Sequence, residues 1–230
     1  MKRIVLIKAL CFILCIAALC ANLTSCSCIC LPSENKGIIQ NLKYSINGKK
    51  DAVTSKNFTV TGAMLSYYFY QNYSDFLNQY GTMSSYLGLD ISMSLKDQSA
   101  MDSSDQTWFE YFMDPTLEQI KVMLVYCESA KEDGIQLYSY ELNNIDNAID
   151  AIIDSAEEYG YSTSSYISSL YGLGVSTDDI KAAMELEALC QKYISIKKEE
   201  LGGAFNYMYD FAEIKYPITY NYEVINNIDA

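Results

Sequence analysis

The residue types that most often carry out chemistry are scarce in this chain. It contains no His, and its only Arg is Arg3. A Ser-His-Asp triad, a Cys-His pair, a His-ligated zinc site and an arginine finger therefore cannot be built. The formal charge is −13, from 16 Lys and Arg against 29 Asp and Glu. Because phosphate contacts need cationic side chains, this balance predicts no binding to nucleic acid.

Carboxylates remain as candidates for chemistry. The neighbours Asp178 and Asp179, and the pair Asp150 and Asp154, could bind a hard cation such as calcium. The sequence has no Asp-x-Asp-x-Asp-Gly loop, so a solvated acidic face is the expected role. Glu187 falls within the apolar arc of a predicted helix, where a buried carboxylate could act as an acid or base. Since it lacks a His or Arg partner, we expect it at the rim of that arc, reaching water.

The cysteines leave two possibilities open. Cys26, Cys28 and Cys30 have a spacing that could bind a metal, but no fourth ligand is nearby. Cys127 and Cys190 could form a disulfide if the protein is exported. They could also be small buried hydrophobes on helix faces, which is the interpretation we favour. We predict no catalytic residue, no metal and no cofactor.

The first residues have the pattern of an export signal. Met1, Lys2 and Arg3 precede an apolar run from Ile4 to Leu23. The tetrapeptide Leu23-Thr24-Ser25-Cys26 then resembles the bacterial lipobox. That resemblance implies cleavage before Cys26 and a lipid on its thiol. An uncleaved N-terminal anchor is the alternative, and both place the rest of the chain outside the cytoplasm, at the cell membrane.

The remaining chain divides into three further predicted segments. Residues 26–56 have weak periodicity and are predicted to form a tether, with a short strand near Leu42–Ile46. Residues 57–203 are predicted to form a helical domain. Residues 204–230 are predicted to be a C-terminal extension with one strand. Residues 1–25 would be the signal peptide.

Apolar residues at helical spacing predict a mainly α fold, an irregular bundle of about four to six helices with a short C-terminal strand. Ser176 suits a helix N-cap, and Pro115 should kink or break the helix that contains it. The helical segments are about 61–80, 105–134, 142–156 and 176–201, with a short helix near 164–171, and glycines at 81, 134, 160 and 202 follow the long ones.

The tail from Tyr216 to Val224 alternates apolar and polar residues, which predicts a strand. No later segment supplies a partner strand. It would therefore pair with the tether, with another molecule, or with a domain that this chain lacks.

Three stretches carry a family resemblance: residues 58–70, residues 107–135 and residues 157–176. Their order resembles the N-terminal helical domain of SurA/PrsA-type extracytoplasmic chaperones, over roughly residues 57–200. The resemblance implies a helical domain that cradles unfolded or newly exported polypeptides, and a lipid anchor fits the PrsA-like foldases. In those proteins a parvulin domain, a peptidyl-prolyl isomerase, often follows, and its site normally uses His. A chain without His is expected to be a chaperone module alone or a truncated isomerase.

Several large apolar and aromatic residues fall off the main helix faces and are predicted to form a peptide-binding surface: Tyr67, Tyr70, Trp108, Tyr111, Val122 and Val125. Tyr suits such a surface because its ring buries area while its hydroxyl stays hydrated. The alternative is that these residues fill the boundary of the core. We predict a lipid-anchored, non-catalytic, chaperone-like protein that binds unfolded polypeptides. A truncated isomerase and a surface lipoprotein with one fixed partner are the alternatives.

Overall fold

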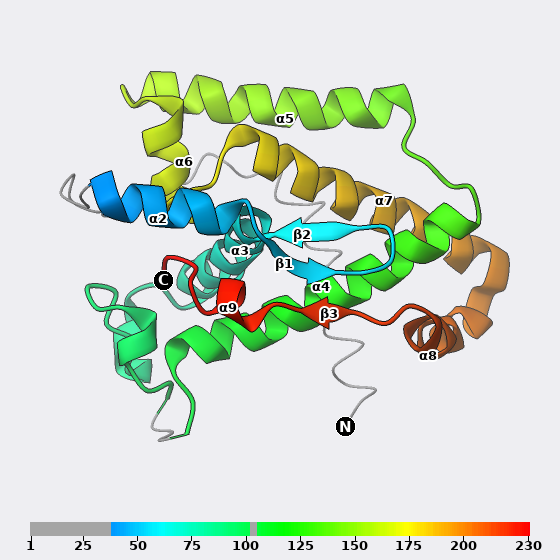
Figure 1. The fold of residues 1–230 in the computed structure, drawn as a ribbon, viewed down its shortest axis with the longest axis horizontal. Coiled ribbons are helices and arrows are strands. Elements are labelled where there is room, and N and C mark those ends of the chain that lie inside the picture. The colour runs from blue at the N-terminus through cyan, green and yellow to red at the C-terminus, as the bar shows by residue number, and fades with distance from the viewer. Residues whose placement is uncertain (1–37, 102–104) are drawn as a thin grey trace. The chain divides into compact units, whose positions relative to one another are not determined.

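The fold is described for residues 38–101 and 105–230 of a computed structural model, and it is mainly helical with a small antiparallel sheet (Figure 1). The predicted fold class is confirmed. The predicted signal peptide, residues 1–25, and the predicted lipidation site Cys26 lie outside the described residues.

The secondary structure follows most of the predicted segments. The helices are α2 (Ile38–Gly48), α3 (Gly62–Tyr80), α4 (Trp108–Glu132), α5 (Ser139–Glu158), α6 (Thr163–Tyr171), α7 (Thr177–Leu201), α8 (Phe205–Lys215) and α9 (Tyr222–Ile225). Three short 3-10 turns are η1 (Gly81–Leu87), η2 (Leu95–Asp97) and η3 (Gly202–Ala204). The strands are β1 (Asp51–Thr54), β2 (Thr59–Thr61) and β3 (Thr219–Tyr220).

Helix α4 is covered on several sides, because it packs against α3, α7, α8 and β1. Of the kink or break predicted at Pro115, the break is wrong, since α4 continues through this residue. Pro115 lies on the exposed face of the helix. Water can therefore reach the carbonyl of Tyr111, which has lost its amide donor, while the buried faces on either side hold the helix together.

The predicted helix ends are confirmed where side chains or glycine supply the cap. The Ser176 hydroxyl accepts a hydrogen bond from the Asp179 amide at 3.3 Å, and the Asp179 carboxylate accepts one from the Ser176 amide at 2.9 Å. This is a capping box. At the other end of α7, Gly202 has a φ of 54°, which favours glycine.

The sheet has the order β2-β1-β3, so the C-terminal strand pairs with a strand of the predicted tether. In this antiparallel pair, Val53 lies opposite Tyr220 and Thr54 opposite Thr219. Of the three partners considered for the C-terminal strand, the tether is the correct one. The strand is only two residues long, because Asn221 caps α9 immediately afterwards.

The boundaries predicted at 56 and 203 do not separate structural units. Residues 38–48, predicted as tether with a strand near Leu42–Ile46, form α2, which packs on α3. The Asn47 side chain donates to the carbonyl of Val224 at 3.0 Å, so α2 is tied to the C-terminal segment. Val224, Ile225 and Ile228 are all buried. The predicted tether and extension therefore close the same core.

Candidate functional site

The predicted peptide-binding residues do not form a surface. Tyr67 is 4% exposed, Trp108 0%, Val122 3% and Val125 0%. Helices α3 and α4 carry these residues, and each is packed on more than one side. Residues off the main face of such a helix meet a second neighbouring element, so the expectation of an exposed surface is wrong for these four residues.

The other two predicted residues also make internal contacts. The Tyr70 hydroxyl donates to the carbonyl of Asp229 at 2.9 Å, which joins α3 to the end of the chain. The Tyr111 ring lies 5.1 Å from the Trp108 ring and 6.0 Å from the Phe76 ring, between α3 and α4. Both tyrosines are half-buried. The six residues therefore belong to the core and its boundary, which was the alternative interpretation.

A groove lies elsewhere, between the C-terminal end of α4, the segment that follows it, α5 and α7. Its volume is about 430 Å³, within the range of ligand-binding clefts. Its apolar side chains are half-buried, and they are Phe58, Ile135, Leu137, Leu142, Leu186 and Leu189.

Polar side chains stand at the edge of this groove. Lys131, Gln136 and Glu185 are the polar residues of its lining, which Gly134 completes. The Lys131 ammonium is exposed and donates to the Asn57 side-chain oxygen at 3.0 Å, and it lies 5.7 Å from the Phe58 ring centre. Among the described residues it forms no ion pair with a carboxylate.

The segment between α4 and α5 supplies free main-chain groups beside the apolar side chains. The amides of Gln136 and Leu137 donate no hydrogen bond within the part of the chain that the structure describes. The Gln136 carbonyl is held by the Lys192 ammonium at 2.7 Å, and this ammonium also lies 2.7 Å from the Glu141 carboxylate. Glu141 in turn accepts from the Tyr138 amide at 2.6 Å. The segment is thus fixed in place, and its Gln136 and Leu137 amides donate to no other described residue.

The β1–β2 turn holds Phe58 at the other side of the groove. A buried carboxylate on α4, Glu128, accepts hydrogen bonds from the Ser55 hydroxyl at 2.7 Å, the Asn57 amide at 2.5 Å and the Asn57 side-chain amide at 2.6 Å. Glu128 is 1% exposed. A buried carboxylate with three donors is well satisfied, so its role here is to position the turn.

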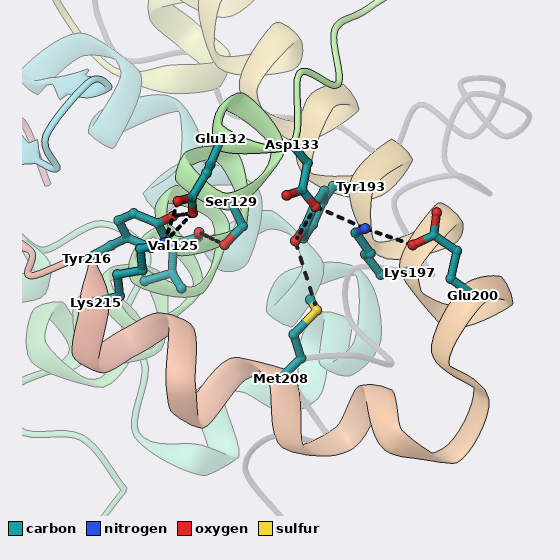
Figure 2. Close-up of polar contacts among 10 residues, drawn as sticks. All are labelled: Val125, Ser129, Glu132, Asp133, Tyr193, Lys197, Glu200, Met208, Lys215 and Tyr216. Carbon is teal, nitrogen blue, oxygen red and sulfur yellow. Dashed lines mark hydrogen bonds and ion pairs between the residues drawn. The ribbon is translucent and has the colours of Figure 1, made fainter.

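Ion pairs surround the end of α4 on the side facing α8 (Figure 2). Lys197 on α7 lies 2.9 Å from Asp133 and 2.7 Å from Glu200. The two acceptors raise the pKa of Lys197. The Tyr193 hydroxyl donates to Asp133 at 3.3 Å and lies 3.9 Å from the Met208 sulfur. Every charged group in this cluster has a partner, so we assign it a structural role.

The expectation that Glu187 reaches water is wrong for one of its oxygens. The side chain as a whole is half-buried, but Oε1 is buried and has no hydrogen-bond partner within the described chain. Burial raises the pKa of Glu187 to about 8. Burial raises the pKa of the nearby Tyr171 to about 12. The charges of Tyr166 and Glu187 add to this rise, in that order. No described cationic residue pairs with Glu187.

The cysteines of the helical body are both free and buried, so the favoured interpretation of Cys127 and Cys190 is confirmed. Burial raises the pKa of each thiol. The described residues contain no group of three or more His, Cys, Asp or Glu that could hold a metal ion. None of the described helices is long and apolar enough to cross a membrane.

Comparison with protein families, characterised proteins and solved structures finds no match to this chain. The resemblance to the SurA/PrsA-type chaperones therefore remains a prediction, and the groove is interpreted from its own geometry.

Sequence reasoning missed the groove because its residues come from four separate segments. One signal was present: Ile135 and Leu137 follow the helix-ending Gly134 and lie between the predicted helices 105–134 and 142–156. Apolar residues in a connection between helices must pack on something or bind something, and here they line the groove.

Proposed function

We propose that this protein is a chaperone-like, non-catalytic binder of unfolded or newly exported polypeptides, and that the groove between α4, α5 and α7 receives them. The observation that carries the proposal is the pairing of an apolar groove with two lining residues, Gln136 and Leu137, whose amides donate to no other described residue. An unfolded polypeptide offers both kinds of partner, because it exposes apolar side chains together with its own main-chain groups.

The polarity of the groove favours a polypeptide over a small molecule. Sites for small molecules usually place a few polar groups so that they converge on the ligand. Here the side chains inside are aliphatic or aromatic, and Lys131 and Glu185 are the charged residues of the lining. Such a groove selects for apolar character and not for one particular ligand, as holding many unfolded chains requires.

Charge and location complete the proposal. We infer that the processed chain is anchored outside the cytoplasm through a lipid on Cys26. Removing residues 1–25 would take away Lys2, Arg3 and Lys8, leaving 13 Lys against 29 acidic residues, a charge of −16. A strong net charge keeps a complex with an apolar client soluble.

The test is suppression of aggregation of an unfolded protein, with a charge placed inside the groove. Leu189→Glu should abolish most of the suppression, because a carboxylate would have to be buried against the client. Leu201→Glu is the matched control: it lies on the same helix, and Leu201 is 41% exposed and outside the groove. Equal suppression by both variants would reject the groove as the binding site.

A second measurement separates holding from catalysis. The chain has no His. We therefore expect cis–trans isomerisation of a Pro-containing peptide to keep its uncatalysed time constant of tens to hundreds of seconds. Acceleration by the purified protein would favour the isomerase alternative. If the protein fails to bind any unfolded chain but captures one protein strongly, the fixed-partner alternative holds.

A further inference from the structure

Helix α8 presents an apolar face that no described residue covers. Tyr207, Phe211 and Ile214 are 60%, 74% and 84% exposed. Their spacing of four and three places them on one side of the helix. The opposite side, with Phe205, Tyr209 and Ala212, is buried. A contiguous exposed face of this kind usually marks a place of interaction. We call Tyr207, Phe211 and Ile214 the α8 face.

The helix that carries this face is fixed to the rest of the fold. Lys215 at its end lies 2.5 Å from the Glu132 carboxylate, and the Tyr216 hydroxyl donates to the same carboxylate (Figure 2). Lys121 on α4 forms an ion pair with Glu213. Ion pairs between α4 and α8 therefore hold the α8 face in a fixed position, as a docking surface requires.

The α8 face and the groove lie on either side of the same helix end. Glu132 holds α8, while the preceding residue, Lys131, lines the groove. The charges also match: Asp210, on the exposed side of α8, and Lys131 at the groove are both exposed, and neither has an ion-pair partner among residues 38–101 and 105–230. The groove lining carries one ammonium, Lys131, and one carboxylate, Glu185, so an apolar helix face with one acidic residue fits where that residue meets Lys131.

We propose that the α8 face of one molecule docks into the groove of a second copy of this chain, with Asp210 directed to Lys131 of the other molecule. This inference rests on the groove of the proposed function and goes beyond it. The α8 face and a client would then compete for the groove, so that self-association covers it when clients are scarce.

A membrane surface fits the α8 face less well. Helices that lie on membranes carry Lys and Arg on their polar side, where they meet anionic lipids. Helix α8 instead carries Asp210 beside the α8 face and Glu213 paired with Lys121 of α4, and its only Lys, Lys215, is already paired with Glu132. Helix α8 therefore offers no unpaired cation to an anionic lipid, whereas its exposed Asp210 can meet Lys131 of a second copy.

The test uses two full-length chains with different tags, co-expressed, extracted in mild detergent and purified through one tag. Wild-type chains should co-purify. The face variant Phe211→Ser/Ile214→Ser should not pair with itself, and neither should the groove variant Leu189→Glu. The face variant mixed with the groove variant should pair again, because one intact face meets one intact groove. This exchange pattern is specific to face-in-groove contact.

A charge swap covers the case in which Leu189→Glu fails to fold. Lys131→Glu should weaken self-pairing several-fold, and adding Asp210→Lys to the same chain should restore it. Absence of co-purification of wild-type chains overturns the inference. Self-pairing of the groove variant at the wild-type level also overturns it, since the faces would then meet each other.

The two proposals can fail separately. If chains do not pair but Leu189→Glu still loses aggregation suppression, the inference is wrong and the proposed function stands. If the exchange pattern is seen but Leu189→Glu suppresses aggregation as well as wild type, the function is wrong and the inference stands. The face variant should suppress aggregation at least as well as wild type, because its groove is free.

Discussion

Replacing Glu187 with Gln should make the protein more stable at neutral and alkaline pH. The Oε1 atom of Glu187 is buried without a hydrogen-bond partner among the described residues, and burial raises the pKa of this carboxyl group from 4.5 to about 8. The folded protein therefore favours the protonated form. Gln has the same shape and stays neutral at every pH, so the variant does not pay for removing a charge from water.

The sign and size of the effect follow from the difference between folded and unfolded pKa. A raised carboxyl pKa costs nothing below the unfolded value of 4.5, and the cost grows as pH rises from 4.5 through about 8. At 1.36 kcal/mol per tenfold change, the cost is about 3 kcal/mol at neutral pH and about 5 kcal/mol at alkaline pH. These are upper values, because part of the side chain reaches water.

The measurement is urea unfolding near pH 5 and at about pH 8.5. This range runs from near the unfolded pKa of Glu187, 4.5, to just above its folded pKa of about 8, so the cost in stability grows across it. Trp108 is the only Trp and is fully buried, so its fluorescence reports unfolding. Glu199→Gln, at an exposed position on the same helix, is the control for removing one negative charge. Free energies of unfolding that change with pH equally in wild type and Glu187→Gln would refute the reasoning.

Three further predictions concern the fold. Glu128→Ala should lower the free energy of unfolding by about 3 kcal/mol in urea titrations, because three donors from the Ser55–Asn57 turn lose their acceptor; a change near zero would contradict the assigned role. Pro115→Ala should stabilise the protein by about 1–2 kcal/mol, since Ala restores an amide donor inside a continuous helix; a lower melting temperature would contradict this. Cys127 and Cys190 should resist alkylation in the native protein and react on unfolding, as read by peptide mass spectrometry, because both thiols are buried; modification of native protein would show that they are accessible.

Local signals were enough to predict most helices. Periodic apolar residues and the glycines that follow them gave α3, α5, α6 and α7 close to their observed bounds. Helix α8 was missed because Gly202 and Gly203 were interpreted as the end of the helical body. Its buried residues Phe205, Tyr209 and Ala212 recur at helical spacing, so the same criterion would have found it.

The site could not be predicted because periodicity identifies only one face of a helix. Trp108, Val122 and Val125 lie off the main apolar face of α4. Periodicity alone therefore predicts that they are on the surface. In the structure they meet other elements that cover the helix. Burial of a second face depends on which elements pack together, and that arrangement is set by contacts between distant segments, such as Asn47 with Val224.

The same reasoning explains the C-terminal segment. Its alternation predicts a strand but does not choose among three possible partners for it. Strand pairing between Val53 and Tyr220 joins residues far apart in the sequence. No local pattern marks such a pair, because the tether strand β1 is only four residues long.

Site-specific photo-crosslinking tests the central claim, that the groove holds unfolded polypeptides. A photoreactive phenylalanine at position 189 lies inside the groove, and the same group at position 201 lies on the exposed part of the same helix. With an unfolded client present, we predict strong client crosslinks from position 189, weak ones from 201, and loss of the former when an apolar peptide is added in excess. Equal crosslinking from both positions, or none from position 189, would contradict the account.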